Sequence, residues 1–100
     1  MRELERDSSS DDPSCGLAII GQGRLGRALS QALATHPEYR IQGPLGRGAV
    51  AQDADVALLC VPDQEIAAAA ATIAPGCLLG HCSGATTLEP LHPHEAFSLH

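Results

Sequence analysis

The run GLAIIGQGRLGRAL, residues 16–29, decides how the rest of the chain is arranged. It predicts a short apolar strand, a tight glycine turn and then a helix. Gly21, Gly23 and Gly26 have the spacing of the dinucleotide-binding fingerprint. In that fingerprint the first glycine turns the chain, the second lets a pyrophosphate approach the backbone, and the third lets the helix pack on the strand. The start of the helix offers free N–H groups and a positive dipole end to phosphates.

We interpret this turn as a nucleotide-binding loop whose contacting residues are Gly21, Gln22, Gly23, Arg24, Leu25 and Gly26. The alternative is an ordinary glycine-rich connection, because glycine makes up 10 of the 100 residues. The context favours the nucleotide, since an apolar run precedes the turn and an amphipathic run follows it. We expect one face of that helix to carry Leu25, Leu29, Ala32 and Leu33.

Composition limits the class of protein. Hydrophobic residues make up 44% and aromatic residues 2%, which predicts an aliphatic core of strands covered by helices. The net charge of -6 argues against a nucleic-acid surface. No apolar run approaches the roughly 20 residues of a membrane span, and no secretory signal begins the chain, so we expect a cytoplasmic location. The four cysteines lack CxxC spacing and indicate reduced thiols, with a disulfide or zinc site as the alternative.

Alternating strand and helix patterns predict an α/β fold, a doubly wound, mostly parallel, Rossmann-like sheet. We expect residues 1–14 to form a disordered leader and residues 15–100 to form a dinucleotide-binding domain that is incomplete at its C-terminus. The expected strands are 15–20, 39–42, 56–61, 77–81 and 97–99, with Gly43-Pro44 ending the second. The expected helices are 24–35 and 64–73, with helical turns at 49–54 and 87–91.

Ligands of such sheets lie beyond the carboxyl ends of the strands, and those ends carry glycine or polar residues here. Besides the glycine turn, they comprise the segment 43–47, then Val61, Pro62 and Asp63, then the segment 81–84, and finally His100. We assign the segment 61–63 to the cofactor site. The alternative for Asp63 is a helix cap that satisfies backbone N–H groups.

The end of the second strand indicates which cofactor binds. An NAD site usually places an acidic residue there, whereas residues 42–46 read QGPLG. Arg47 and Arg24 are placed to hold a 2′-phosphate through charge-assisted hydrogen bonds. We therefore favour NADP, with NAD as the alternative cofactor and a solvated surface charge as the alternative for Arg47.

His81 and Ser83 are the expected catalytic residues, because they lie with His100 nearest the nicotinamide end of the site. A histidine can exchange protons near neutral pH, and a serine can bond a carbonyl. The alternative is that both satisfy backbone groups of a turn. His92, His94 and Glu95 have a spacing that could chelate a metal, but Pro93 interrupts them and no matching ligand cluster exists, so we expect no metal site.

Four motifs occur in order: IGQGRLG at 20–26, VPD at 61–63 before an alanine-rich run, HCSGA at 81–85 and FSLH at 97–100. In these the chain resembles the N-terminal Rossmann-like domain of the DUF2520 family, which is similar to 6-phosphogluconate-dehydrogenase-like and pyrroline-5-carboxylate-reductase-like NADP oxidoreductases. The resemblance covers residues 15–100. It implies that the full-length protein continues into further sheet and a helical domain, which completes the active site and a homodimer.

The resemblance implies the cofactor-binding part of an NADP-dependent oxidoreductase, inactive by itself. Hydride would pass to or from a small carbonyl or imine substrate, which the resemblance does not identify. Two alternatives remain open, a non-catalytic nucleotide-binding module and an inactive fragment with an incomplete sheet edge.

Overall fold

Five strands form one parallel sheet in the computed structural model, which describes residues 15–46, 51 and 53–99. The strand order is β2-β1-β3-β4-β5, and every neighbouring pair is parallel. The elements in chain order are β1 (Cys15–Ile20), α1 (Arg24–Ala34), β2 (Tyr39–Leu45), β3 (Val56–Leu59), the 3₁₀ turn η1 (Asp63–Glu65), α2 (Ile66–Ala70), β4 (Leu78–His81), the 3₁₀ turn η2 (Glu89–Leu91) and β5 (Ala96–Ser98).

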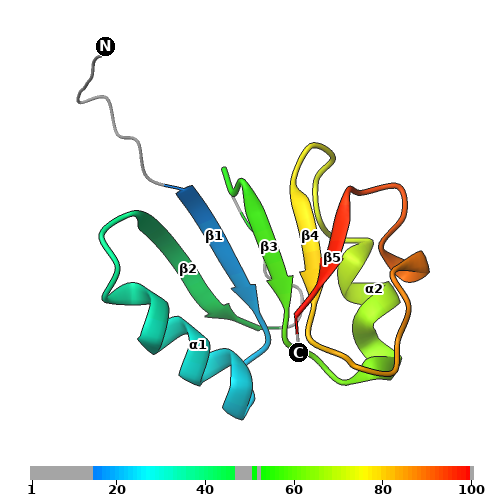
Figure 1. The fold of residues 1–100 in the computed structure, drawn as a ribbon, viewed down its shortest axis with the longest axis horizontal. Coiled ribbons are helices and arrows are strands. Elements are labelled where there is room, and N and C mark those ends of the chain that lie inside the picture. Colours follow the sequence, from blue (N-terminus) through cyan, green and yellow to red (C-terminus); the bar gives the residue numbers. More distant parts are fainter. Residues whose placement is uncertain (1–14, 47–50, 52, 100) are drawn as a thin grey trace.

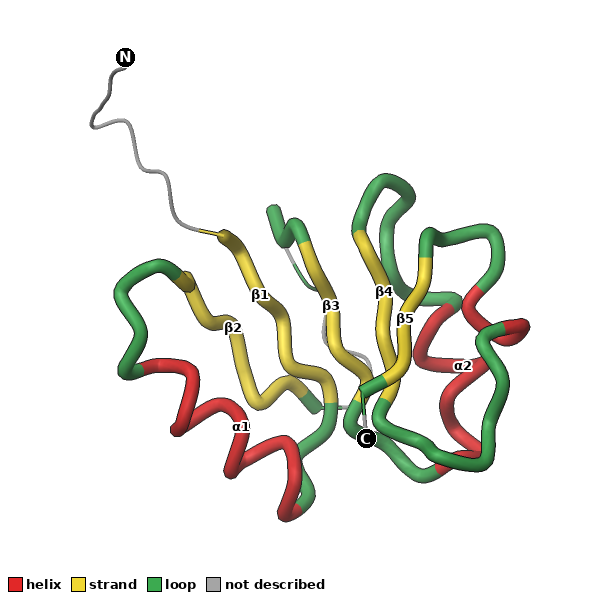
Figure 2. The backbone as a smooth tube through the Cα atoms, viewed as in Figure 1, coloured by secondary structure: helices red, strands yellow, loops and turns green. Residues whose placement is uncertain are grey.

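Helices cover both faces of the sheet, which confirms the α/β, doubly wound arrangement (Figures 1 and 2). Successive strand residues point to opposite faces, so Ile19 and Ile20 belong to two separate core clusters. One cluster packs under α1 through Leu29 and Leu33. The other packs under α2 and η2 and contains the larger share of fully buried side chains, among them Leu59, Ile66, Leu79 and Leu91.

The second strand is longer than the sequence predicts. We expected Gly43-Pro44 to end it, but β2 continues to Leu45, which pairs with Ile20. Proline is tolerated because β2 is an edge strand, so its missing N–H disrupts no second ladder. Gly43 has a φ of 133°, a region that favours glycine, and the register with β1 shifts at this point. The prediction that these two residues break the strand is therefore wrong.

The segment after β3 also differs from expectation. β3 ends at Leu59 rather than at residue 61, and the predicted helix 64–73 is the short turn η1 followed by the five-residue α2. Asp63 lies inside η1, and no side chain caps η1 or α2. The helix-cap prediction for Asp63 is therefore wrong, since the chain enters this segment through the extended backbone of Pro62.

The predicted apolar face of α1 is observed in part. Leu29 and Leu33 pack against the sheet as expected, whereas Leu25 is 47% exposed and Ala32 is exposed. Gly26 and Ser30 are the buried residues of the helix, and the missing side chain of Gly26 allows the first turn to touch the residue after β1. The remaining strands and the turn η2 agree with the sequence to within about two residues at each boundary, the usual uncertainty of such limits.

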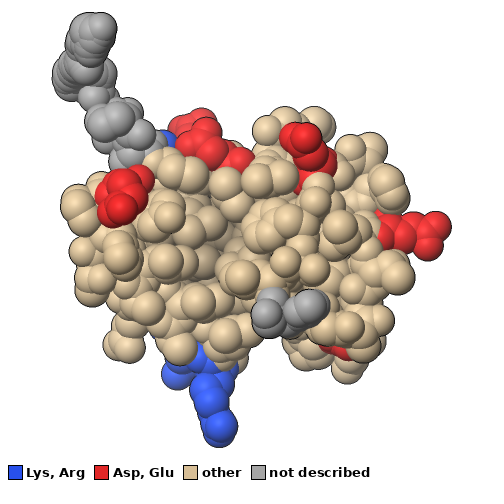
Figure 3. Space-filling view, viewed as in Figure 1, with Lys and Arg blue, Asp and Glu red and all other residues tan. Residues whose placement is uncertain are grey.

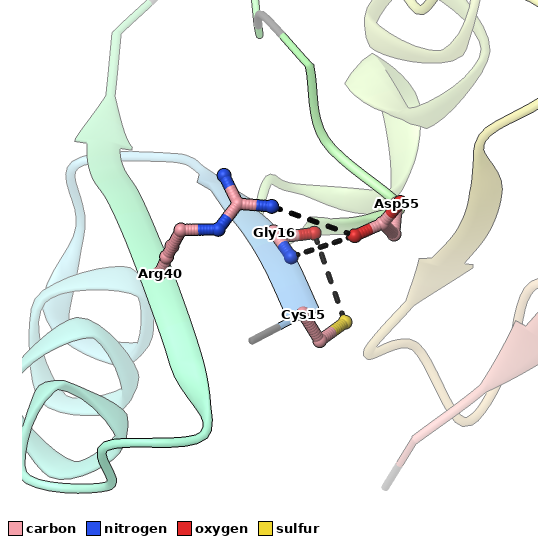
Figure 4. Close-up of polar contacts among 4 residues, drawn as sticks. All are labelled: Cys15, Gly16, Arg40 and Asp55. Carbon is pink, nitrogen blue, oxygen red and sulfur yellow. Dashed lines mark hydrogen bonds and ion pairs between the residues drawn. The ribbon is translucent and has the colours of Figure 1, made fainter. Parts of the chain in front are cut away.

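A polar contact that the sequence did not reveal joins strands at the amino edge of the sheet (Figure 4). The N–H of Gly16 donates to Oδ2 of Asp55 at 2.8 Å, and the N–H of Asp55 donates to the carbonyl of Gly16 at 2.8 Å. A guanidinium nitrogen of Arg40 lies 3.8 Å from the same carboxylate oxygen. The reciprocal bonds tie the start of β1 to the residue before β3.

Candidate nucleotide-binding site

Three glycines shape the turn between β1 and α1, and each has a different environment. Gly21 has a φ of 122°, and a Cβ there would overlap the carbonyl of Cys60. A Cβ on Gly26 would overlap the carbonyl oxygen of Gly21. A Cβ on Gly23, in contrast, would meet no atom within 4 Å. Two glycines are therefore required by the fold, while the third leaves open space in front of the backbone.

The N-terminus of α1 faces this open space without a side-chain cap. Gly23 is the N-cap residue, with extended backbone at φ -77° and ψ -168°, and no side chain bonds to the first turn. That turn contains no acidic residue. Unsatisfied N–H groups and the positive end of the helix dipole together attract an anion.

Positive charge gathers at the same place. The first turn of α1 carries Arg24 and Arg27, and the blue side chains at the lower edge of Figure 3 lie where α1 begins in Figure 1. Nε of Arg27 donates to the carbonyl of Gln22 at 2.8 Å, which holds the guanidinium against the turn. An open groove of about 880 Å³ has Gln22, Arg24 and Arg27 in its lining. The sequence analysis missed Arg27, although its place one turn after Gly23 is a readable signal.

The strand order places a second pocket beside the glycine turn. β1 has β2 on one side and β3 on the other, so the chain order reverses there, and ligands of open parallel sheets bind at such points. A largely apolar pocket of about 560 Å³ lies at this position. Its lining includes Gly21, Leu45, Gly46, Val61, Gln64 and Ala68. Within the groove, Nε2 of Gln22 donates to the carbonyl of Pro44, another residue of the groove lining, at 3.4 Å.

The structure brings together most of the cofactor residues expected from the sequence. Gly21 and Val61 line the pocket, and Gln22 and Arg24 line the groove, whereas the other turn residues, Gly23, Leu25 and Gly26, line neither. Pro62 and Asp63 follow Val61 as exposed residues outside the pocket lining. Arg47 and His100 lie outside the described residues, as do the expected leader 1–14 and three residues (49, 50 and 52) of the expected helical turn 49–54. The other three, residues 51, 53 and 54, are not helical, so the expected turn is wrong there.

His81 and Ser83 organise the turn after β4. Nε2 of the fully buried His81 donates to the carbonyl of Thr87 at 2.9 Å, and Nδ1 accepts the N–H of Ser83 at 3.1 Å. Oγ of Ser83 accepts the N–H groups of Ala85 and Thr86 at 3.1 and 2.9 Å. Both ring nitrogens of His81 are thus bonded to backbone, and this assigns the Nε2–H tautomer. A catalytic role for the pair stays a prediction.

The histidines near residue 93 lie at the opposite edge of the sheet. Nδ1 of His94 is 3.1 Å from the carbonyl oxygen of Leu91, and Nε2 is 3.1 Å from that of Ile73. These contacts join the segment before β5 to the segment after α2. Within the described part of the chain, no group of three or more His, Cys, Asp or Glu side chains could hold a metal ion.

The residues at the carboxyl edge fit the phosphates of a dinucleotide. Gly23 leaves the backbone accessible, α1 supplies uncapped N–H groups, and Arg24 adds positive charge.

The described residues contain no helix long and apolar enough to cross a membrane. No protein-family model matches the chain, and comparisons with curated proteins and with solved structures likewise find no match.

Proposed function

We propose that this chain is the cofactor-binding part of an NAD(P)-dependent oxidoreductase, related to the DUF2520 family by the motifs described above. The observation that carries the proposal is the open backbone at Gly23, between two glycines that the fold needs for close packing. This arrangement at a helix N-terminus is the one that the dinucleotide fingerprint requires. A turn that served only to connect β1 to α1 would not need a glycine at position 23.

NADP is the cofactor that we propose. Leu45 and Gly46, at the end of β2, line the apolar pocket, which suits an adenine ring. The end of β2 carries no acidic residue of its own to bond a ribose 2′-hydroxyl, since residues 42–46 read QGPLG, and the acidic residue in the pocket lining, Glu65, comes from η1. Arg24 and, from the sequence, Arg47 would then meet the 2′-phosphate. NAD remains the alternative cofactor.

The proposed reaction is hydride transfer between the nicotinamide and a small carbonyl or imine compound. The turn of His81 and Ser83 follows β4, on the side of β3 away from the proposed adenine pocket, where the substrate would approach. We further propose a cytoplasmic full-length protein that forms a homodimer, in which the helical domain completes the site. The isolated chain is expected to bind cofactor without turnover.

A second candidate function is a nucleotide-binding module without chemistry. It is favoured by the state of His81, which is fully buried with both ring nitrogens bonded to backbone groups. In this arrangement His81 holds the turn and has no nitrogen free to exchange a proton with a substrate. The two functions differ in turnover by the full-length protein and agree in cofactor binding by this chain.

The cofactor choice is tested by calorimetric titration of NADPH and NADH into the chain and into Arg47→Ala. We expect tighter binding of NADPH, and we expect Arg47→Ala to weaken NADPH about ten-fold, a loss of about 1.4 kcal/mol, while leaving NADH nearly unchanged. Arg40→Ala, at the amino edge, is the matched control. Tighter binding of NADH would overturn the choice of NADP, and binding of neither would overturn the proposed function.

A further inference from the structure

Two cysteines lie side by side at the carboxyl ends of adjacent strands. Cys60 directly follows β3 and Cys82 directly follows β4. Leu59 pairs with His81 in the β3–β4 register, so the two cysteines occupy the next pair of positions. Their sulfur atoms are 3.8 Å apart and share a hydrogen bond.

The backbone spacing suits a disulfide. Neighbouring strands of a sheet lie about 4.8 Å apart, which falls within the range of about 4.4–6.8 Å that a disulfide spans between Cα atoms. A bond of about 2.05 Å between the sulfurs requires a change of side-chain rotamers and a small approach of the strand ends. Neither cysteine is fully buried, and both flank the core cluster under α1 rather than lying inside it. A small reagent can therefore reach the pair.

The other two cysteines provide an internal comparison. Cys15 begins β1 and Cys77 precedes β4, so both lie at the amino edge of the sheet. Each sulfur contacts the carbonyl of the next residue, at 3.9 Å for Cys15 and 3.6 Å for Cys77. In the described structure the close contact between two sulfurs is confined to Cys60 and Cys82.

We propose that Cys60 and Cys82 form a reversible disulfide by exchange with a small disulfide of the glutathione type. First, the thiolate of Cys82 attacks one sulfur of the reagent and releases one thiol, which leaves a mixed disulfide on Cys82. The thiol of Cys60 then loses its proton, attacks the sulfur of Cys82 and releases the second thiol. The two cysteines lose two hydrogen atoms in total, and the reagent is reduced to two thiols.

The environment of the two thiols sets this order of attack. Burial, followed by the charge of Cys82 and the hydrogen bond with it, raises the pKa of Cys60 to about 12. Burial also raises the pKa of Cys82, but the hydrogen bond from Cys60 lowers it in part. Cys82 is therefore the first nucleophile. Because thiolate is the reacting form, the rate of bond formation should rise with pH.

The disulfide would connect the end of β4 to Cys60, whose backbone contacts the glycine turn. The N–H of Cys60 donates to the carbonyl of Ile20 at 2.7 Å, and the carbonyl of Cys60 occupies the space in which a side chain on Gly21 would lie. A bond from Cys60 to Cys82 thus joins the end of β4 to the backbone that holds this turn. The proposal concerns the thiols themselves and does not depend on which nucleotide the turn binds.

The proposal is tested by incubating the reduced chain with excess oxidised glutathione at about pH 9, because burial raises the pKa of Cys82 and leaves little thiolate nearer neutral pH. Free thiols are then blocked and peptides are mapped without reduction. We expect a Cys60–Cys82 linkage that dithiothreitol reverses. The double variant Cys15→Ser/Cys77→Ser should form it equally well. Cys60→Ser should stop at a glutathione adduct on Cys82, whereas Cys82→Ser should leave Cys60 reduced.

Two results would overturn the proposal. One is a folded double variant, checked by circular dichroism, that keeps both thiols or carries a glutathione adduct without closing the bond. The other is a wild-type chain that links Cys15 or Cys77 in place of the Cys60–Cys82 pair. A rate of bond formation that does not change between about pH 7 and pH 9 would contradict attack by a thiolate.

Discussion

At the glycine turn, the space available for an added methyl group distinguishes two glycines that the fold requires from one that leaves room for a ligand. Gly21 and Gly26 each lie against a backbone carbonyl, and Gly23 faces open space. The spacing of the glycines predicts a role for each of them, but it does not reveal that the carbonyl facing Gly21 belongs to Cys60, because that contact depends on the end of β3, far along the chain. The roles that the sequence predicted for Gly21 and Gly26 agree with the observed geometry.

We expect Gly21→Ala and Gly26→Ala each to lower the free energy of unfolding by about 2 kcal/mol or more, because the new Cβ forces the backbone carbonyls apart. Gly23→Ala is the matched control and should change the stability by less than about 1 kcal/mol, since its backbone is extended and its surroundings are open. Urea denaturation measures all three. Equal losses at the three positions would contradict the described packing.

His81 carries a second prediction at this scale. His81→Phe fills the buried site but leaves the N–H of Ser83 and the carbonyl of Thr87 without partners. We expect a loss of about 2 kcal/mol in unfolding free energy, against about 1 kcal/mol for Ser83→Ala, whose hydroxyl lies in a partly exposed turn. Thermal denaturation checks both. An unaltered stability in His81→Phe would mean that the histidine does not hold this turn.

Among the elements, the uniformly apolar strands could be predicted and the irregular ones could not. The runs that form β1, β3 and β4 are buried in the sheet, and their largely apolar composition predicts them as strands. β2 passes through Gly43-Pro44 because it lies at the edge, a fact that only the strand order supplies. The alanine-rich run has strong helix propensity, yet α2 is short, because tertiary packing of Ile66 and Ala70 decides its length.

The contact between β1 and the start of β3 predicts a difference between two variants of Asp55. Asp55→Ala removes the acceptor for the N–H of Gly16, and we expect a loss of about 1.5 kcal/mol in unfolding free energy. Asp55→Asn keeps an acceptor oxygen and loses only the charge that faces Arg40, so its loss should be about 0.5 kcal/mol. Chemical denaturation distinguishes the two. Equal losses would assign the effect to charge rather than to the hydrogen bond.

Across the whole molecule, charge is unevenly distributed: Figure 3 shows basic side chains at the lower edge and acidic side chains mainly along the upper edge and the right side. The full chain carries a net charge of -6, yet the basic side chains of the first turn of α1 stand at the carboxyl edge, beside the open backbone of Gly23. Net charge alone therefore describes this edge poorly. The strand order explains how the candidate site is assembled, because it brings the glycine turn, the end of β2 and the segment after β3 to one edge of the sheet.

The central claim is that the space in front of Gly23 receives the phosphates of a dinucleotide, and titration of NADPH into the wild-type chain and Gly23→Val tests it most directly. The valine should fold normally, as the open surroundings allow, and Ala32→Val on the exposed side of α1 controls for a valine in this segment. We predict saturable binding by the wild type and the control, and binding at least about ten-fold weaker in Gly23→Val. Equal affinity in all three chains would contradict the account.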